Sequence, residues 1–302
     1  MSTPGRIVAQ IGLETTPGTP VTPTLALPII GDGFTVEPTQ HQADLRLNWA
    51  FPSRGRSIPV GHTVRGSFRS FLNLQTARDV INLACKRTSG NLSSFTILEN
   101  QYGLGVAQYS GMVSRLSLEM SRSGSPDAGA ILQATVDWEG WRGENAQGTL
   151  QVLTPPDDKA FHLRHSTVKI NNVSYPDWLS MRLSIFNEIG LGPPDSSNKR
   201  LFMISGEETV EVEHTIRMAS TSLRTLIEAG TDAVTNDIVA GTGTANETIT
   251  FAIGKAQIEG LPRSAQDGYM VVSPSLRPMH TGSVHQLVAT FGSSVPTSII
   301  GL

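Results

Sequence analysis

Three groups of side chains have the chemical types that catalysis or metal binding needs, and the first contains two histidines. His162 and His165 stand three residues apart, with Asp157 and Asp158 close by. On a helix such histidines would share one face and could bind a metal ion. Pro155-Pro156 before them and a strand-like sequence after them argue against a helix. We therefore interpret them as solvent-exposed or interface residues, and we predict neither a metal nor a cofactor.

The second group surrounds Cys85, the single cysteine of the chain. It stands near the end of a predicted amphipathic helix, and the adjacent Lys86 and Arg87 would favour a reactive thiolate. No sequence motif of a known cysteine nucleophile surrounds it, so we interpret it as a packed thiol. One cysteine also excludes an internal disulfide and a zinc site with several cysteines.

The third group consists of carboxylates, because Glu207, Glu211 and Glu213 share one face of a predicted strand whose other face is apolar. Two interpretations stay open, namely a solvated sheet face and an acidic wall that faces a channel. Paired carboxylates for glycoside hydrolysis are a third interpretation. Such sites need an aromatic cleft that stacks on sugar, and the nearest tryptophan, Trp178, is far away in sequence.

Motifs of the common enzyme classes are missing from the sequence. It contains no His-Glu-x-x-His, Gly-x-Ser-x-Gly, Gly-x-x-x-x-Gly-Lys or Cys-x-x-Cys. Gly241-Thr242-Gly243-Thr244 is rich in glycine, but no lysine follows it, so we interpret it as a hairpin loop. We predict that the protein is not an enzyme.

The elements that must position these residues are predicted to be strands. Of 302 residues, 16% are charged and 6% aromatic, and 29 glycines and 18 prolines interrupt the chain. Such a composition disfavours a helical bundle, and a hydrophobic share of 38% disfavours general disorder. A net charge of −3 gives no basic surface for DNA phosphates. We predict a mainly β chain of two tandem β-sandwich domains, each with one short helix, over 76–86 and 220–230.

The chain divides into an extended N-terminal arm and two β-domains joined by a linker. Prolines and threonines alternate through the arm, where they disfavour a central strand over residues 14–28. No stretch is apolar and long enough to span a membrane, and the start lacks the apolar core of a signal peptide. The expected bounds are 1–30 for the arm, 31–142 for the first domain, 143–160 for the linker and 161–302 for the second domain.

Short segments recur in the same order in the two halves, which suggests an internal repeat. His62–Arg65 corresponds to His214–Arg217, and Gly111–Leu116 corresponds to Gly254–Ile258. Any two β-rich segments align loosely, which is the alternative explanation. We favour a tandem duplication.

Four segments of the sequence resemble the tail tube (major tail) proteins of long-tailed bacteriophages, especially those of the siphovirus type. They are Gly12–Pro20, Val64–Phe68 with the helix that follows it, Tyr109–Leu118 and Arg182–Asn187. The resemblance implies β-sandwich domains whose copies close into rings, with sheets joined into one inner barrel. The rings would stack into a tube with an acidic lumen that conducts DNA during ejection. Two domains in one chain imply trimeric rings with pseudo-sixfold symmetry.

The same resemblance implies a virion structural protein of the tail, assembled in the cytoplasm of the host bacterium. Its partners would be further copies of the chain, the tape-measure protein, the tail tip and the tail terminator, with DNA passing transiently and no insertion into a membrane. Alternatives are another tube-fold component, such as a tail terminator or a type VI inner-tube protein, and a β-sandwich carbohydrate-binding module. The last would need exposed aromatics, and the chain has only 4 Trp and 4 Tyr.

The resemblance also marks candidate residues in the arm, in the loop 44–59 and in the loop 187–199. The candidate contacts between subunits or rings are Glu14, Thr19, Arg54, Arg56, Asn187, Pro193 and Pro194. The candidate acidic residues of the lumen are Glu207, Glu211 and Glu213.

Overall fold

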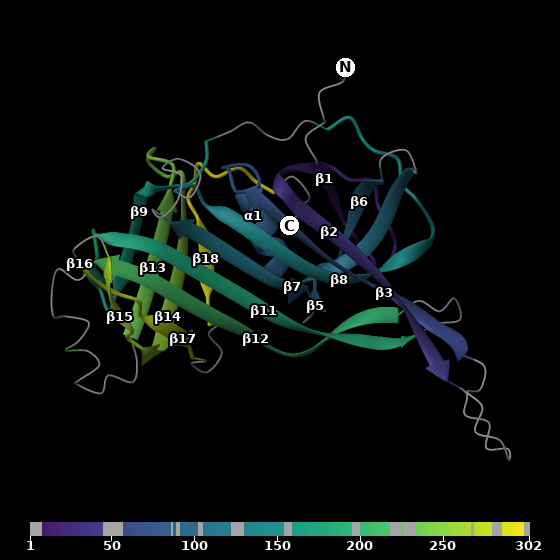
Figure 1. The fold of residues 1–302 in the computed structure, drawn as a ribbon. Coiled ribbons are helices and arrows are strands. Elements are labelled where there is room, and N and C mark those ends of the chain that lie inside the picture. Colours follow the sequence, from purple (N-terminus) through teal and green to yellow (C-terminus); the bar gives the residue numbers. More distant parts are fainter. Residues whose placement is uncertain are drawn as a thin grey trace, which may run out of the picture.

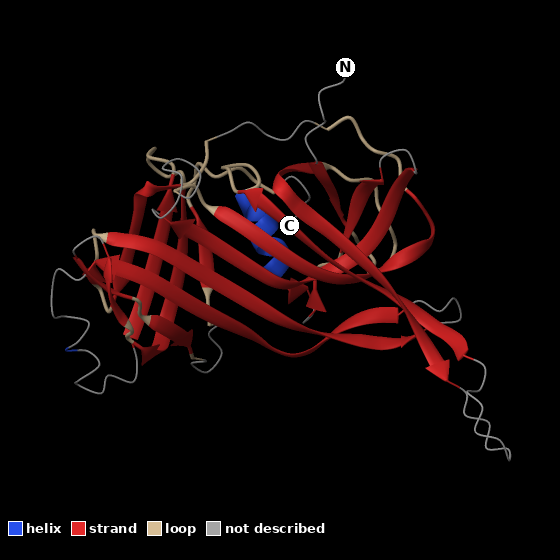
Figure 2. Ribbon diagram, in the orientation of Figure 1, coloured by secondary structure: helices blue, strands red, loops and turns tan. Residues whose placement is uncertain are grey.

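Strands dominate the structure, a computed structural model (Figure 2). The prediction of a mainly β fold is confirmed, and nearly all strands belong to one sheet of 16 strands. The structure describes residues 8–44, 57–85, 87–88, 91–101, 105–121, 130–153, 159–194, 200–217, 225, 234–266, 269–279 and 286–298.

In the first half of the chain, six antiparallel strands close into a barrel. Their order is β1-β2-β3-β8-β7-β6, and β6 pairs with β1 again. Closure pairs both edges of each strand over part of its length, which protects the edges from other chains. The bounds are β1 (Val8–Leu13), β2 (Leu25–Asp44), β3 (Ser57–Phe71), β6 (Phe95–Gln101), β7 (Gly105–Ser121) and β8 (Gln133–Gln147), with β4 (Arg87–Thr88) and β5 (Asn91–Leu92) as a separate pair.

In the second half, the main strands follow the order β9-β13-β14-β17-β12-β11. The last of them, β11, pairs with β7, so the sheet continues from one half of the chain into the other (Figure 1). The bounds are β9 (His162–Ile170), β10 (Val173–Ser174), β11 (Trp178–Pro194), β12 (Arg200–Arg217), β13 (Val234–Gly241), β14 (Thr248–Gly260), β15 (Arg263–Gln266), β16 (Tyr269–Val272), β17 (Ser275–Pro278) and β18 (Val288–Phe291).

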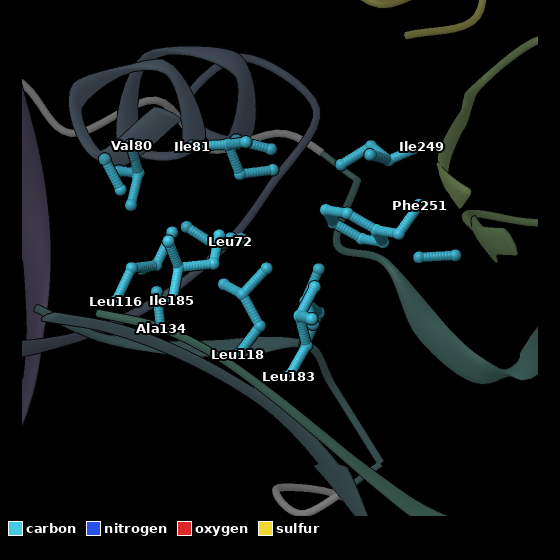
Figure 3. Packing of buried hydrophobic residues seen from close by; sticks show 14 of the residues in the cluster. Leu72, Val80, Ile81, Leu116, Leu118, Ala134, Leu183, Ile185, Ile249 and Phe251 are labelled. Carbon is cyan, nitrogen blue, oxygen red and sulfur yellow. The ribbon is translucent and has the colours of Figure 1, made fainter. Parts of the chain in front are cut away.

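The predicted helix over 76–86 is present as α1 (Ala77–Cys85). The Oδ1 of Asn73 accepts the backbone N–H groups of Gln75 and Thr76, at 3.1 and 2.9 Å, and so orders the turn before the helix. Thr76, the residue before the helix, donates its hydroxyl to the same oxygen. The apolar face of α1 lies over β7 and β11: Val80 and Ile81 point toward Leu116, Leu118, Leu183 and Ile185 (Figure 3).

The region predicted as an N-terminal arm contributes strands to the barrel. The side chains of Ala9 and Ile11 in β1, and of Leu25 and Leu27 in β2, are buried. The prolines that suggested an arm fall mainly in the loop between these strands, while the apolar residues alternate on either side of it. Residues 8–30 therefore form part of the folded body.

The predicted linker differs from the structure in extent. Strand β8 continues to Gln147, and the chain beyond it runs beside β1, where Gln151 and Gln10 exchange two hydrogen bonds of 2.7 and 2.9 Å. Within the predicted second helix the structure describes Thr225, which is helical; the other residues of 220–230 lie outside the described part.

The centre of the barrel is built around Trp138, which is fully buried. Its ring meets Phe95 edge to face, with centroids 6.1 Å apart, and lies 6.0 Å from the Tyr109 ring. Gly66 lies against the indole, so that a Cβ there would come within 2.3 Å of the ring. The Val64–Phe68 motif thus contains a glycine because the tryptophan fills the space of its side chain.

Candidate functional site

The main candidate for a functional surface is one face of eight neighbouring strands, in the order β2-β3-β8-β7-β11-β12-β17-β14. We call it the polar face. Residues alternate along these strands, so one face covers the core and the other carries polar side chains. The charged residues of the polar face include Glu37, Arg65, Arg69, Arg115, Glu119, Asp137, Glu139, Arg182, Glu211, Glu213, Arg217, Arg277 and Glu259.

Several arginines of the polar face are paired with carboxylates of the neighbouring strand. Nitrogen–oxygen distances are 3.2 Å for Arg65–Glu139, 3.1 Å for Arg182–Glu119 and 3.4 Å for Arg277–Glu259. All of these side chains are partly exposed, so each pair adds little to stability. The pairs matter more for surface charge, because they neutralise the guanidinium groups that would attract phosphates.

The carboxylates of the lumen candidates on β12 have no ion-pair partner among the described residues. Glu211 and Glu213 are exposed, and no described residue forms an ion pair with them. The valines between them point into the core, as the alternation predicted. Glu207 lies on the same strand, but its side chain is outside the described part.

The two halves of the chain meet at the pairing of β7 with β11, which we call the internal joint. Residues Ser180–Phe186 pair antiparallel with Arg115–Ser121. On its polar face the hydroxyls of Ser117 and Ser184 lie 3.2 Å apart. On its other face Leu116, Leu118, Leu183 and Ile185 are fully buried beneath α1.

Sequence reasoning did not assign the residues of the internal joint to a site. Segments containing Ser117 and Arg182 were recognised only as motifs. The period-two alternation around Ser117 and Ser184 was visible, but periodicity does not say which strand will lie beside which.

Glu14 and Asn187, predicted as contacts between subunits, make contacts inside the chain. The carboxylate of Glu14 accepts the N–H of Gly18 and the hydroxyl of Thr96, both at 2.9 Å. Burial raises the pKa of the Glu14 carboxyl, and these hydrogen bonds oppose the shift. Asn187 is buried in β11, and its amide donates to the carbonyls of Ala84 and Val113, at 3.0 and 3.2 Å.

Among the other predicted contacts, the structure describes Thr19, Pro193 and Pro194. Thr19 is exposed in the loop after β1. Pro193 and Pro194 end β11, which runs further than the predicted loop 187–199 allowed, and Pro194 pairs with Arg200. Arg54 and Arg56 lie outside the described residues.

The predicted histidine pair lies on a strand. His162 and His165 belong to β9, with ring centroids 6.1 Å apart, and the Nδ1 of His162 accepts the N–H of Arg164. No group of three or more His, Cys, Asp or Glu side chains in the described residues could hold a metal ion. No described helix is long and apolar enough to cross a membrane.

His214 is a buried imidazole on β12. Its Nε2 lies 3.2 Å from the amide oxygen of Asn236. Burial lowers its pKa to about 4, and the hydrogen bond that the imidazole donates to Asn236 only partly opposes this shift. The neutral ring therefore belongs to the core and is separate from the polar face.

Comparison with known proteins identifies the class of molecule to which this fold and surface belong. The sequence matches the phage tail tube protein family over residues 6–276, and the chain therefore belongs to that family. No curated protein matches the sequence. The chain is a structural subunit of a phage tail tube, a component of the virion tail, and its family is a structural family and not an enzyme family.

Proposed function

We propose that copies of this chain assemble into stacked rings and form the conduit for DNA ejection in a long non-contractile tail of the siphovirus type. The observation that carries the proposal is the polar face, a single sheet surface to which both halves of the chain contribute strands. Its paired arginines and its unpaired Glu211 and Glu213 would keep DNA phosphates from binding to the wall.

We also propose that the chain is a tandem duplication and that its rings are trimers with pseudo-sixfold symmetry. The strand order supports this proposal: β1-β6-β7-β8-β3-β2 in the first half has the same order as β9-β13-β14-β17-β12-β11 in the second. Each half gives four strands to the polar face, so three chains would supply six equivalent units.

Contacts between rings are proposed for Thr19 in the loop after β1, for Pro193 and Pro194 at the end of β11, and for Arg54 and Arg56. Glu14 and Asn187 are left out because their polar atoms are used inside the chain. Assembly in the host cytoplasm, on a tape-measure protein between the tail tip and the tail terminator, follows from the proposed role.

Electron microscopy of the purified protein at increasing concentration, with and without isolated tail tips as nuclei, tests the proposal. We expect tubes of stacked rings with an open lumen and three chains in each ring. Rings of six chains would contradict the trimer, and a monomer that never polymerises, even on tail tips, would contradict the tube itself.

A further inference from the structure

At the internal joint two strand edges pair within the chain, whereas two other strand edges are left unpaired within the described residues. The inference drawn from this difference rests on the proposed function and deepens it. We propose that β14 of one copy pairs antiparallel with β2 of the next copy, in the register of the internal joint. The partner is therefore a second copy of this chain, and the surfaces that meet are two strand edges.

The four strands that the first half gives to the polar face form one row of core-facing side chains. Phe34 of β2 pairs with Phe68 of β3, which pairs with Val136 of β8, which pairs with Leu116 of β7. The last three are fully or almost fully buried, whereas Phe34 is only partly buried.

The second half has a matching row. Leu183 of β11 pairs with Val212 of β12, which pairs with Leu276 of β17, which pairs with Ile258 of β14. Here the first three are fully or almost fully buried, and Ile258 is only partly buried. The two incompletely buried members, Phe34 and Ile258, thus stand at the two outer ends of the eight strands.

Both outer ends leave strand edges unpaired within the described residues. Strand β1 covers β2 only from Leu25 to Pro28, and β13 covers β14 only as far as Ala256. The edges of 31–37 in β2 and of 257–260 in β14 therefore have backbone groups available for another strand. In the first half, β6 likewise ends opposite Gly111, and β11 occupies the edge of β7 beyond it.

Equivalence of the two rows fixes the register between copies. Leu116 pairs with Ile185 in the internal joint, and Ser117 pairs with Ser184. Leu116 and Ile258 hold equivalent places in the two rows, and so do Leu183 and Phe34. Between copies, Ile258 should therefore pair with Val36, which would bury both partly exposed side chains. On the polar face, Glu259 should pair with Thr35. No new contact type is required, because the same antiparallel pairing is already present in each chain.

Cysteine cross-linking tests the register in assembled tubes, in a background in which Cys85→Ala removes the native thiol. Thr35→Cys/Glu259→Cys should give covalent oligomers up to the ring size on a non-reducing gel after mild oxidation. Ser117→Cys/Ser184→Cys is the matched control, since the two hydroxyls lie 3.2 Å apart and the disulfide should form within one chain. Thr35→Cys/Gln257→Cys, shifted by two residues, should cross-link several-fold less.

A mixture of chains carrying only Thr35→Cys with chains carrying only Glu259→Cys provides a second measurement that needs no double variant. It should give a covalent dimer and nothing larger, and neither variant alone should give it. Tubes that form in the microscope but yield no Thr35–Glu259 cross-link in either format would overturn this joint and leave the proposed function standing. Failure to form tubes at all would count against the proposed function.

Discussion

At the scale of single residues, His214 shows how a titratable group in the core makes stability depend on pH. The unfolded chain binds a proton near the ordinary histidine pKa of about 6.5. In the folded chain burial lowers that pKa to about 4, so between these values the unfolded state binds more protons. Stability should therefore rise with pH across this window and be lost as pH falls through it.

We predict that His214→Leu will remove most of this dependence. The full linkage amounts to about 3 kcal/mol between pH 6.5 and pH 4. The variant will lose some stability at neutral pH, because the amide of Asn236 loses a partner. Urea unfolding measured at several pH values gives the slope. His165→Leu, at an exposed position, is the control that should keep the wild-type slope.

The sequence predicted surface charge better than it predicted polar contacts. Alternation along β12 placed Glu211 and Glu213 on one face, and both are exposed in the structure. The resemblance to tail tube proteins marks Glu14 and Asn187 as candidate contacts between subunits. Their partners within the chain, Thr96 and Val113 among them, are remote in sequence, and no local pattern indicates such a pair.

At the scale of elements, the close approach of β3 to β8 depends on glycine at position 66. We predict that Gly66→Ala will destabilise the protein by about 1–3 kcal/mol, because the new methyl group would overlap the indole of Trp138. Gly254→Ala on β14 is the matched control: a Cβ there meets nothing within 4 Å, and the change should stay within about 1 kcal/mol. Thermal and urea unfolding of the two variants would show equal losses if the packing around Trp138 were irrelevant.

Strand β1 provides a second test at this scale, because the sequence predicted an arm where the structure has a strand. Ile11 is fully buried between β2 and β6. We predict that Ile11→Ala will cost about 2–5 kcal/mol. Val152→Ala, at a fully exposed position outside the strands, should change stability by less than about 0.5 kcal/mol. A loss at Ile11 as small as that at Val152 would show that this segment is not part of the core.

Element types were predictable from local sequence, and element pairing was not. The amphipathic pattern predicted α1, and period-two alternation predicted the strand that carries Glu211 and Glu213. The closure of β6 on β1 and the internal joint connect residues far apart along the chain. The repeated segments hinted at two similar halves, but the anchor of His62 with His214 does not follow the strand pairing, in which Phe68 and Val212 hold equivalent places.

At the scale of the whole molecule, the polar face is expected to act through its charge. We predict that tubes assembled from Glu211→Lys/Glu213→Lys will retain short duplex DNA at low salt and release it at high salt, since new cations bind phosphates with a strong salt dependence. Wild-type tubes should not retain it. Asp177→Lys/Asp237→Lys makes the same change in charge away from this face and serves as the control. Co-sedimentation of DNA with tubes measures the effect, and equal retention by both variants would contradict a lumen position for Glu211 and Glu213.

The internal joint also bears on how assembly would depend on protein concentration. Its two edges are held in one chain, so they meet at a fixed effective concentration however dilute the protein is. In a ring built as proposed, every second junction between sheet halves would already be formed within one chain before two chains associate. Only the junctions between chains would form less readily on dilution. Ring formation should therefore need fewer encounters than a ring of single-domain subunits with the same number of junctions.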